Sequence, residues 1–149
     1  MHTNQQEEEE MDDCPICNET LPKLLSKFMR MECCGKGMHK KCYNDIFESS
    51  LSDKQKDQCL LCRTERPKSH EETVERIRRW AEKGKAWAQC MLGCRYRDGE
   101  GVDQSYQQAR ELFELSASQG NISAQYNLGV MYHEGQGVDQ SYERAAKYY

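Results

Sequence analysis

The sequence AQCMLGCRYRDGEGVDQSY, residues 88–106, returns as AQYNLGVMYHEGQGVDQSY at residues 124–142. When residues 84–113 are aligned with residues 120–149, 14 of 30 positions are identical at a shift of 36. A repeat period of this length indicates helical units that bury their apolar faces by stacking on one another. The second half of the chain is therefore predicted to be an all-α solenoid of helix pairs.

Each copy has the pattern of a helix, a turn that contains glycine, and a second helix. Gly99 and Gly101 suit the turn because glycine adopts backbone angles that a side chain resists. Ser105 and Gln108 resemble a capping box at the start of the second helix, and Gly120 suits its end. The local signals thus agree with the helix pairs that the repeat predicts.

These positions resemble the Sel1-like repeat family, whose pattern of AxxxLG, Tyr, GxG-V and a later Ala occurs here almost twice. The resemblance implies a right-handed, TPR-like solenoid that serves as a protein-binding scaffold and has no catalytic role. Residues 73–84 fall in register with residues 109–120. Residues 73–149 are therefore expected to contain a half repeat at 73–84, a repeat at 85–120 and an incomplete repeat at 121–149.

Seven of the nine cysteines lie between residues 14 and 62, and a domain of that size has little core without a metal or a disulfide. Two tetrahedral zinc ions need eight ligands, and cysteine and histidine are the ligands that zinc favours. A redox dithiol is the alternative, but the thioredoxin-like α/β pattern that would accompany it is missing. A zinc domain is therefore predicted at residues 14–66, with two zinc ions and eight candidate ligands: Cys14, Cys17, Cys33, Cys34, His39, Cys42, Cys59 and Cys62.

This order of ligands resembles the RING finger, a small α+β cross-brace in which ligand pairs one and three share one zinc ion and pairs two and four share the other. The resemblance implies one site made of Cys14, Cys17, His39 and Cys42 and a second made of Cys33, Cys34, Cys59 and Cys62. The chain departs from the family because Cys33 and Cys34 are adjacent, which strains two ligands of one ion. Cys34 fits the family spacing better, and His70 or water is the alternative to Cys33.

The ligand order also resembles the PHD finger, a reader of histone tails. PHD fingers usually carry an aromatic residue two positions before the seventh ligand, where this chain has Asp57. They also lack a helix at residues 41–51, where Cys42, Ile46, Phe47 and Leu51 recur at helical spacing. The RING resemblance is favoured, and the PHD finger remains an alternative.

The RING resemblance implies an E3 ubiquitin ligase that docks a ubiquitin-loaded conjugating enzyme and orients it, without a covalent intermediate of its own. Ile16, Ile46 and Leu60 match the apolar contact positions, although many active members have proline in place of Leu60. Arg63 matches the arginine that bridges ubiquitin and its carrier. The repeats would then recruit a substrate or an adaptor. A non-enzymatic scaffold is the alternative, because Ile16 and Ile46 also suit ordinary packing.

Composition limits the partners and the location. Residues 1–13 are rich in glutamate and aspartate and are predicted to be a disordered acidic tail, and residues 67–72, which begin with Pro67, a linker. The net charge of −4 argues against a nucleic-acid partner, since phosphate contacts need a basic face. No apolar stretch is long enough to cross a bilayer, and the acidic start is unlike a secretory leader. We therefore expect a soluble protein of the cytosol or nucleus with no membrane partner.

Overall fold

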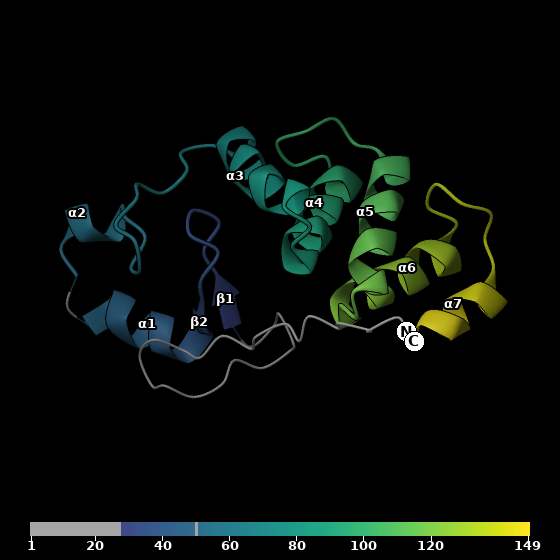
Figure 1. Ribbon diagram of the computed structural model, residues 1–149, viewed down its shortest axis with the longest axis horizontal. Helices are drawn as coiled ribbons and strands as arrows, with labels where there is room; N and C mark the ends of the chain where they lie inside the picture. The colour runs from purple at the N-terminus through teal and green to yellow at the C-terminus, as the bar shows by residue number, and fades with distance from the viewer. Residues whose placement is uncertain (1–27, 50) are drawn as a thin grey trace, which may run out of the picture.

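The structure is a computed structural model that describes residues 28–49 and 51–149 (Figure 1). The strands gather with α1 and α2 at one end, and the later helices follow one another toward the other end. No helix in these two described ranges combines the length and the apolar character needed to span a bilayer. The elements in chain order are β1 (Phe28–Arg30), β2 (Gly37–His39), α1 (Lys40–Ser49), α2 (Asp53–Lys56), α3 (His70–Glu82), α4 (Ala86–Asp98), α5 (Tyr106–Ser118), α6 (Ile122–Glu134) and α7 (Tyr142–Tyr148).

The described residues from 28 to 66, here called the cysteine-rich part, are built on a small antiparallel hairpin. Strands β1 and β2 pair with Met29 opposite Met38. The amide of Gly35 donates to the carbonyl of Met31 at 2.7 Å and closes the turn between the strands. Gly35 has φ of +70°, a conformation that glycine adopts without steric cost. The hairpin therefore places the dipeptide Cys33-Cys34 in its turn.

Helix α1 follows β2 directly and confirms the helix predicted from apolar spacing, although it begins one residue before position 41 and ends two before position 51. Tyr43 and Phe47, one turn apart on α1, stack with their ring centroids 5.4 Å apart. The buried core of this part is small and consists of Met31, Met38, Tyr43 and Cys59. Such a core leaves much of the stability to come from another source.

Helices α3 to α7, here called the repeat stack, pack each on the next in chain order. Phe113 of α5 is fully buried against α4, and a Cβ at Gly93 would lie 2.7 Å from its ring. The contact recurs 36 residues later, where a Cβ at Gly129 would lie 2.8 Å from the ring of Tyr149. The glycine of the AxxxLG motif therefore makes room for an aromatic ring, which comes from α5 in one repeat and from the residue after α7 in the other.

Capping residues determine where the helices of the repeat stack begin and end. Gly99 ends α4 in the left-handed conformation, and Gly135 does the same for α6. The cap predicted at Ser105 is confirmed, because its hydroxyl accepts from the amide of Gln108. Helix α3 begins at His70, before the predicted position 73, because the Ser69 hydroxyl accepts from the Glu72 amide and sets an earlier start.

Candidate metal centre

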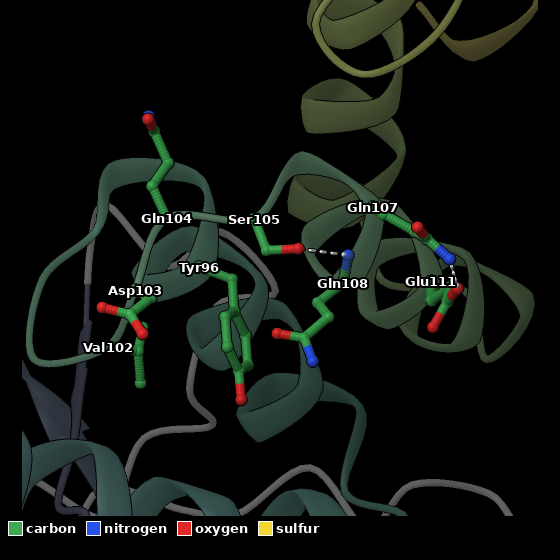
Figure 2. A pocket seen from close by; sticks show the side chains of 8 residues that line it. All are labelled: Tyr96, Val102, Asp103, Gln104, Ser105, Gln107, Gln108 and Glu111. Atoms are coloured by element: carbon green, nitrogen blue, oxygen red, sulfur yellow. Dashed lines mark hydrogen bonds between the residues drawn. The ribbon is translucent and has the colours of Figure 1, made fainter.

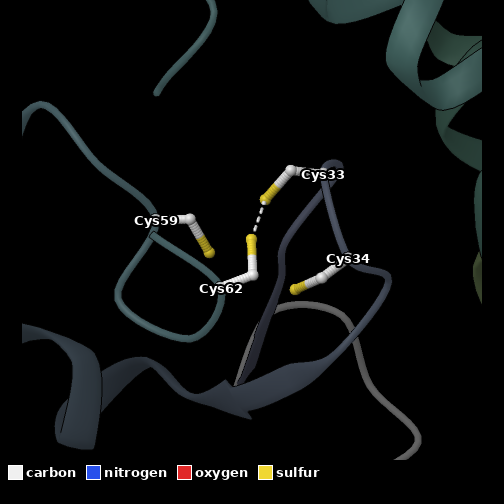
Figure 3. A group of neighbouring side chains, drawn as sticks. All are labelled: Cys33, Cys34, Cys59 and Cys62. Carbon is white, nitrogen blue, oxygen red and sulfur yellow. Dashed lines mark hydrogen bonds between the residues drawn. The ribbon is translucent and has the colours of Figure 1, made fainter. Parts of the chain in front are cut away.

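Four cysteine thiols from two separate turns meet in the cysteine-rich part (Figure 3). Cys33 and Cys34 come from the hairpin turn, and Cys59 and Cys62 come from the turn that follows α2. Their sulfur atoms all lie within 4.8 Å of one another, and all four are free thiols. These are the second and fourth ligand pairs, which the cross-brace arrangement joins across the sequence.

The turn at residues 59–64 is shaped to present its two sulfurs. The amide of Leu61 donates to Sγ of Cys59 at 3.4 Å, and the amide of Arg63 donates to the carbonyl of the same cysteine at 2.9 Å. Arg63 adopts the left-handed conformation with φ of +62°, which a side chain resists. The backbone thus turns back toward the sulfur of Cys59, and an amide aimed at sulfur favours the thiolate that a metal binds.

The hairpin turn brings both adjacent cysteines to the cluster. Sγ of Cys33 lies 3.3 Å from Sγ of Cys62, and Cys34 belongs to the same group of four. His70, the predicted alternative to Cys33, starts α3, and its Nδ1 lies 4.0 Å from a carboxylate oxygen of Glu100. The strain expected from adjacent cysteines therefore does not keep Cys33 out of the cluster.

The thiols of the cluster differ in acidity. Burial raises the pKa of Cys33, and hydrogen bonds with the Cys62 and Cys59 thiols raise it further. Burial also raises the pKa of Cys34, against a hydrogen bond with the Lys36 backbone. Burial acts to raise the pKa of Cys62 as well, but hydrogen bonds with the side chain and backbone of Thr64 and with its neighbours lower that pKa to about 6. Several thiolates this close repel one another, so full ionisation of the group needs a cation between them.

The donor set fits zinc in chemistry and in size. Four thiolates in a tetrahedron are typical of zinc or iron–sulfur sites. A zinc–sulfur bond of about 2.3 Å puts tetrahedral sulfurs about 3.8 Å apart. The Cys33–Cys62 separation of 3.3 Å and the upper limit of 4.8 Å bracket that spacing. The cluster can therefore hold a zinc ion with small movements of its side chains.

The other predicted site is described only in half. His39 ends β2 and Cys42 lies in the first turn of α1, so both come from the junction of strand and helix. Cys14 and Cys17 lie outside the described residues, as do Ile16 and the acidic tail at residues 1–13.

The described residues of the predicted contact surface lie on α1 and beside the metal turn. Ile46 and Leu60 are half-buried, and Leu60 packs against the small core. Arg63 is exposed at the turn that carries Cys59 and Cys62. Thr64 was not predicted as part of the site, yet its Oγ1 lies 3.2 Å from Sγ of Cys62. The signal available in the sequence was its position two residues after the predicted ligand Cys62.

The repeat stack carries an open hollow of about 660 Å³ at the junction of α4 and α5 (Figure 2). The Ser105 hydroxyl in it is engaged in capping α5, and Gln107 donates to Glu111 at 3.2 Å. The lining is mostly polar, so it suits polar contacts with a partner. The residues that line it are Tyr96, Val102, Asp103, Gln104, Ser105, Gln107, Gln108 and Glu111.

Comparison with family models separates the two parts of the chain. Residues 8–80 match the model of the FAR1 N-terminal domain, and no model of RING fingers matches. This match spans the cysteine-rich part and continues into α3. It neither supports two zinc ions nor excludes the metal cluster, which rests on the geometry.

The repeat stack has a firmer set of relatives. Residues 88–121 and 122–149 match the model of the Sel1 repeat. A crystal structure of a Sel1 repeat protein from Oxalobacter formigenes is 32% identical with a TM-score of 0.53, and the match covers 55% of this chain and 24% of that one. No curated protein matches significantly. The helical part of the chain is therefore a Sel1-like repeat region, a kind of structure that suggests protein–protein interaction.

Proposed function

We propose that this protein is a RING-type E3 ubiquitin ligase in which a zinc-bound cysteine-rich part docks a conjugating enzyme and the repeats recruit a protein substrate or adaptor. The observation that carries the proposal is the meeting of Cys33 and Cys34 with Cys59 and Cys62, within 4.8 Å. A RING cross-brace joins the second and fourth ligand pairs in this way.

In this proposal a second zinc ion binds Cys14, Cys17, His39 and Cys42. The junction of β2 and α1 supports it, because His39 ends the strand and Cys42 lies three positions later in the first turn of the helix. The presence of α1 next to the third ligand pair also favours the RING arrangement over the PHD finger, in which no helix is expected at this place.

The docking surface is proposed to be apolar, with a positive charge beside it. Ile46 and Leu60 are half-buried, so each keeps part of its side chain available for a partner. Arg63 is exposed and lies three residues after Leu60, in a turn whose hydrogen bonds fix its backbone. A guanidinium held in this way can bridge the conjugating enzyme and ubiquitin, and such orientation accelerates transfer without a bond to the ligase.

Autoubiquitination with a panel of conjugating enzymes tests the proposal. Ile46→Ala and Leu60→Ala should weaken docking at least tenfold, as removal of a central contact does at other interfaces. Arg63→Gly should keep the turn, because glycine accepts a positive φ, while it slows the transfer of ubiquitin. Arg63→Lys, which keeps the charge but loses the planar fork, is the matched comparison. Native mass spectrometry should find two zinc ions on the parent and on each variant.

A non-enzymatic scaffold is the second candidate, and the match to the FAR1 N-terminal domain in place of a RING model favours it. Its zinc centre would order a binding surface without engaging a conjugating enzyme. A parent protein that holds two zinc ions but transfers no ubiquitin with any enzyme of the panel would establish this candidate. A parent with no zinc at all would contradict both.

A further inference from the structure

The turn that carries Cys33 and Cys34 is held from outside by a tryptophan of the repeat stack. The indole Nε1 of Trp80, on α3, donates to the backbone carbonyl of Glu32 at 2.8 Å. These two residues are 48 positions apart in the sequence, and Glu32 directly precedes Cys33. A helix of the repeats therefore fixes the backbone on one side of the cysteine pair.

The same helix also covers the other side of the pair. Gly35 directly follows Cys34, and a Cβ placed on it would lie 3.1 Å from two ring atoms of Trp80. The side chain of Arg30 donates to the carbonyl of Gly35 at 2.9 Å, and its guanidinium lies 5.4 Å from the ring centroid of Trp87 on α4. Both residues that flank the cysteine pair thus lie against Trp80, Glu32 through a hydrogen bond and Gly35 beside the ring.

Trp80 is at the same time part of the repeat packing. Its ring lies against the buried cluster formed by α3 and α4, which includes Val74, Ile77 and Leu92. The ring of Trp87 belongs to that cluster, with its centroid 6.0 Å from the ring of Trp80. A shift of the cysteine turn would therefore disturb the packing of α3 against α4.

We propose that Trp80 is a positioning residue for the metal centre, which holds the Cys33-Cys34 turn in its ligating conformation and couples metal occupancy to the packing of α3 and α4. This inference rests on the proposed zinc centre. The coupling is reciprocal, because an interaction that favours zinc binding must itself be favoured by zinc. Zinc then stabilises the cysteine-rich part and also the packing of α3 and α4 at the start of the repeat stack.

The test compares the parent with two variants of the full chain by amide hydrogen exchange during titration with buffered zinc. Exchange of residues 31–36 and 59–64 reports this centre separately from the other predicted site. Trp80→Phe keeps an aromatic ring but loses the hydrogen bond to Glu32, and should weaken zinc binding at this centre about fivefold, the effect of one ordinary hydrogen bond. Phe113→Leu, a core change in a buried cluster that includes neither Trp80 nor the four cysteines, should lower the stability of the repeats and leave the zinc affinity unchanged.

Trp87→Phe supplies a second readout, because the emission of this variant comes from Trp80 alone. Removal of zinc with a chelator should shift that emission to longer wavelength as the indole loses its carbonyl partner and becomes hydrated. If Trp80→Phe binds zinc as tightly as the parent and chelation leaves the Trp80 emission unchanged, the inference is wrong while the zinc centre stands. If the parent shows no zinc-dependent protection of residues 31–36 and 59–64, the proposed centre fails and the inference fails with it.

Discussion

The cysteine-rich part and the repeat stack are held together in different ways. The first buries a small core that includes Met38 and Tyr43 and gathers four thiols from two turns. The second buries a continuous series of apolar side chains from α3 to α7, with Ile77 and Phe113 fully enclosed. The repeats are held by a continuous apolar core, whereas the cysteine-rich part has few buried apolar side chains and, in our proposal, depends on a cation between its thiols.

This difference also determines how sequence relates to structure in each part. In the repeats, a lost contact is one of many, since each of the helices α4, α5 and α6 packs on both neighbours. In the cysteine-rich part, the proposed zinc ion would join turns that are far apart in the chain, so the loss of one ligand would remove that connection. Changes of the same chemical size should therefore have unequal effects in the two parts.

Removal of metal is expected to have the largest effect, and it should act on the cysteine-rich part far more than on the repeats. A structural zinc site contributes on the order of 10 kcal/mol to folding, more than the small core of the cysteine-rich part can replace. Chelation should abolish amide protection in residues 31–36 and 59–64 while most helical circular dichroism from the repeats remains. Zinc added back is the control and should restore protection. Protection that survives chelation would mean that the cluster does not hold a metal.

Replacement of one cysteine in each part gives a matched pair. Cys33→Ser removes a proposed ligand and should reduce the zinc count by one in native mass spectrometry. Cys90→Ser places a hydroxyl in the core of the repeats, where the thiol is 1% exposed, and should cost about 1–3 kcal/mol without loss of zinc. Cys34→Ser completes the set and should behave as Cys33→Ser does. Indifference of the zinc count to Cys33→Ser would show that the adjacent cysteine alone serves the ion.

Truncation of a core residue in the repeats should destabilise the repeats and leave the proposed metal centre intact. Phe113→Ala leaves a cavity beside Gly93 and should lower the free energy of unfolding of the repeats by about 3–5 kcal/mol. Urea denaturation followed by circular dichroism measures this loss. The zinc count should be unchanged, and a variant that also lost zinc would indicate that the two parts unfold together.

Much of the repeat stack could be predicted because its signal occurs twice. The shift of 36 residues fixed which positions correspond, and the cap at Ser105 and the turn glycine Gly99 followed from local chemistry. The start of α3 was missed because the apolar pattern begins at Val74, whereas the cap at Ser69 begins the helix earlier. Caps at the edge of a repeat have no second copy against which to align.

The metal centre was predictable in its members but not in its surroundings. Ligand spacing pointed to Cys59 and Cys62, and the family resemblance paired them with Cys33 and Cys34, as the structure does. The role of Trp80 was not predicted, because a hydrogen bond to a backbone carbonyl 48 residues away leaves no periodic pattern in the sequence. Contacts of this kind depend on how the two parts pack, which spacing along the chain does not encode.

Two equivalent capping serines test whether the same position contributes equally to stability in both repeats, and the expected effects are small. Ser105 and Ser141 occupy equivalent positions, and each hydroxyl accepts from the amide three residues later, at 3.3 Å in both cases. Substitution of either by alanine removes a cap and should cost about 1 kcal/mol where the helix is part of the cooperative unit. Ser105→Ala should therefore lower the midpoint of urea unfolding, because α5 packs against both α4 and α6. Ser141→Ala should lower it less, because α7 packs mainly against α6 and can fray without unfolding the stack. Equal shifts for the two variants would show that the repeats unfold as one unit through α7, and that position within the stack does not change what a cap contributes.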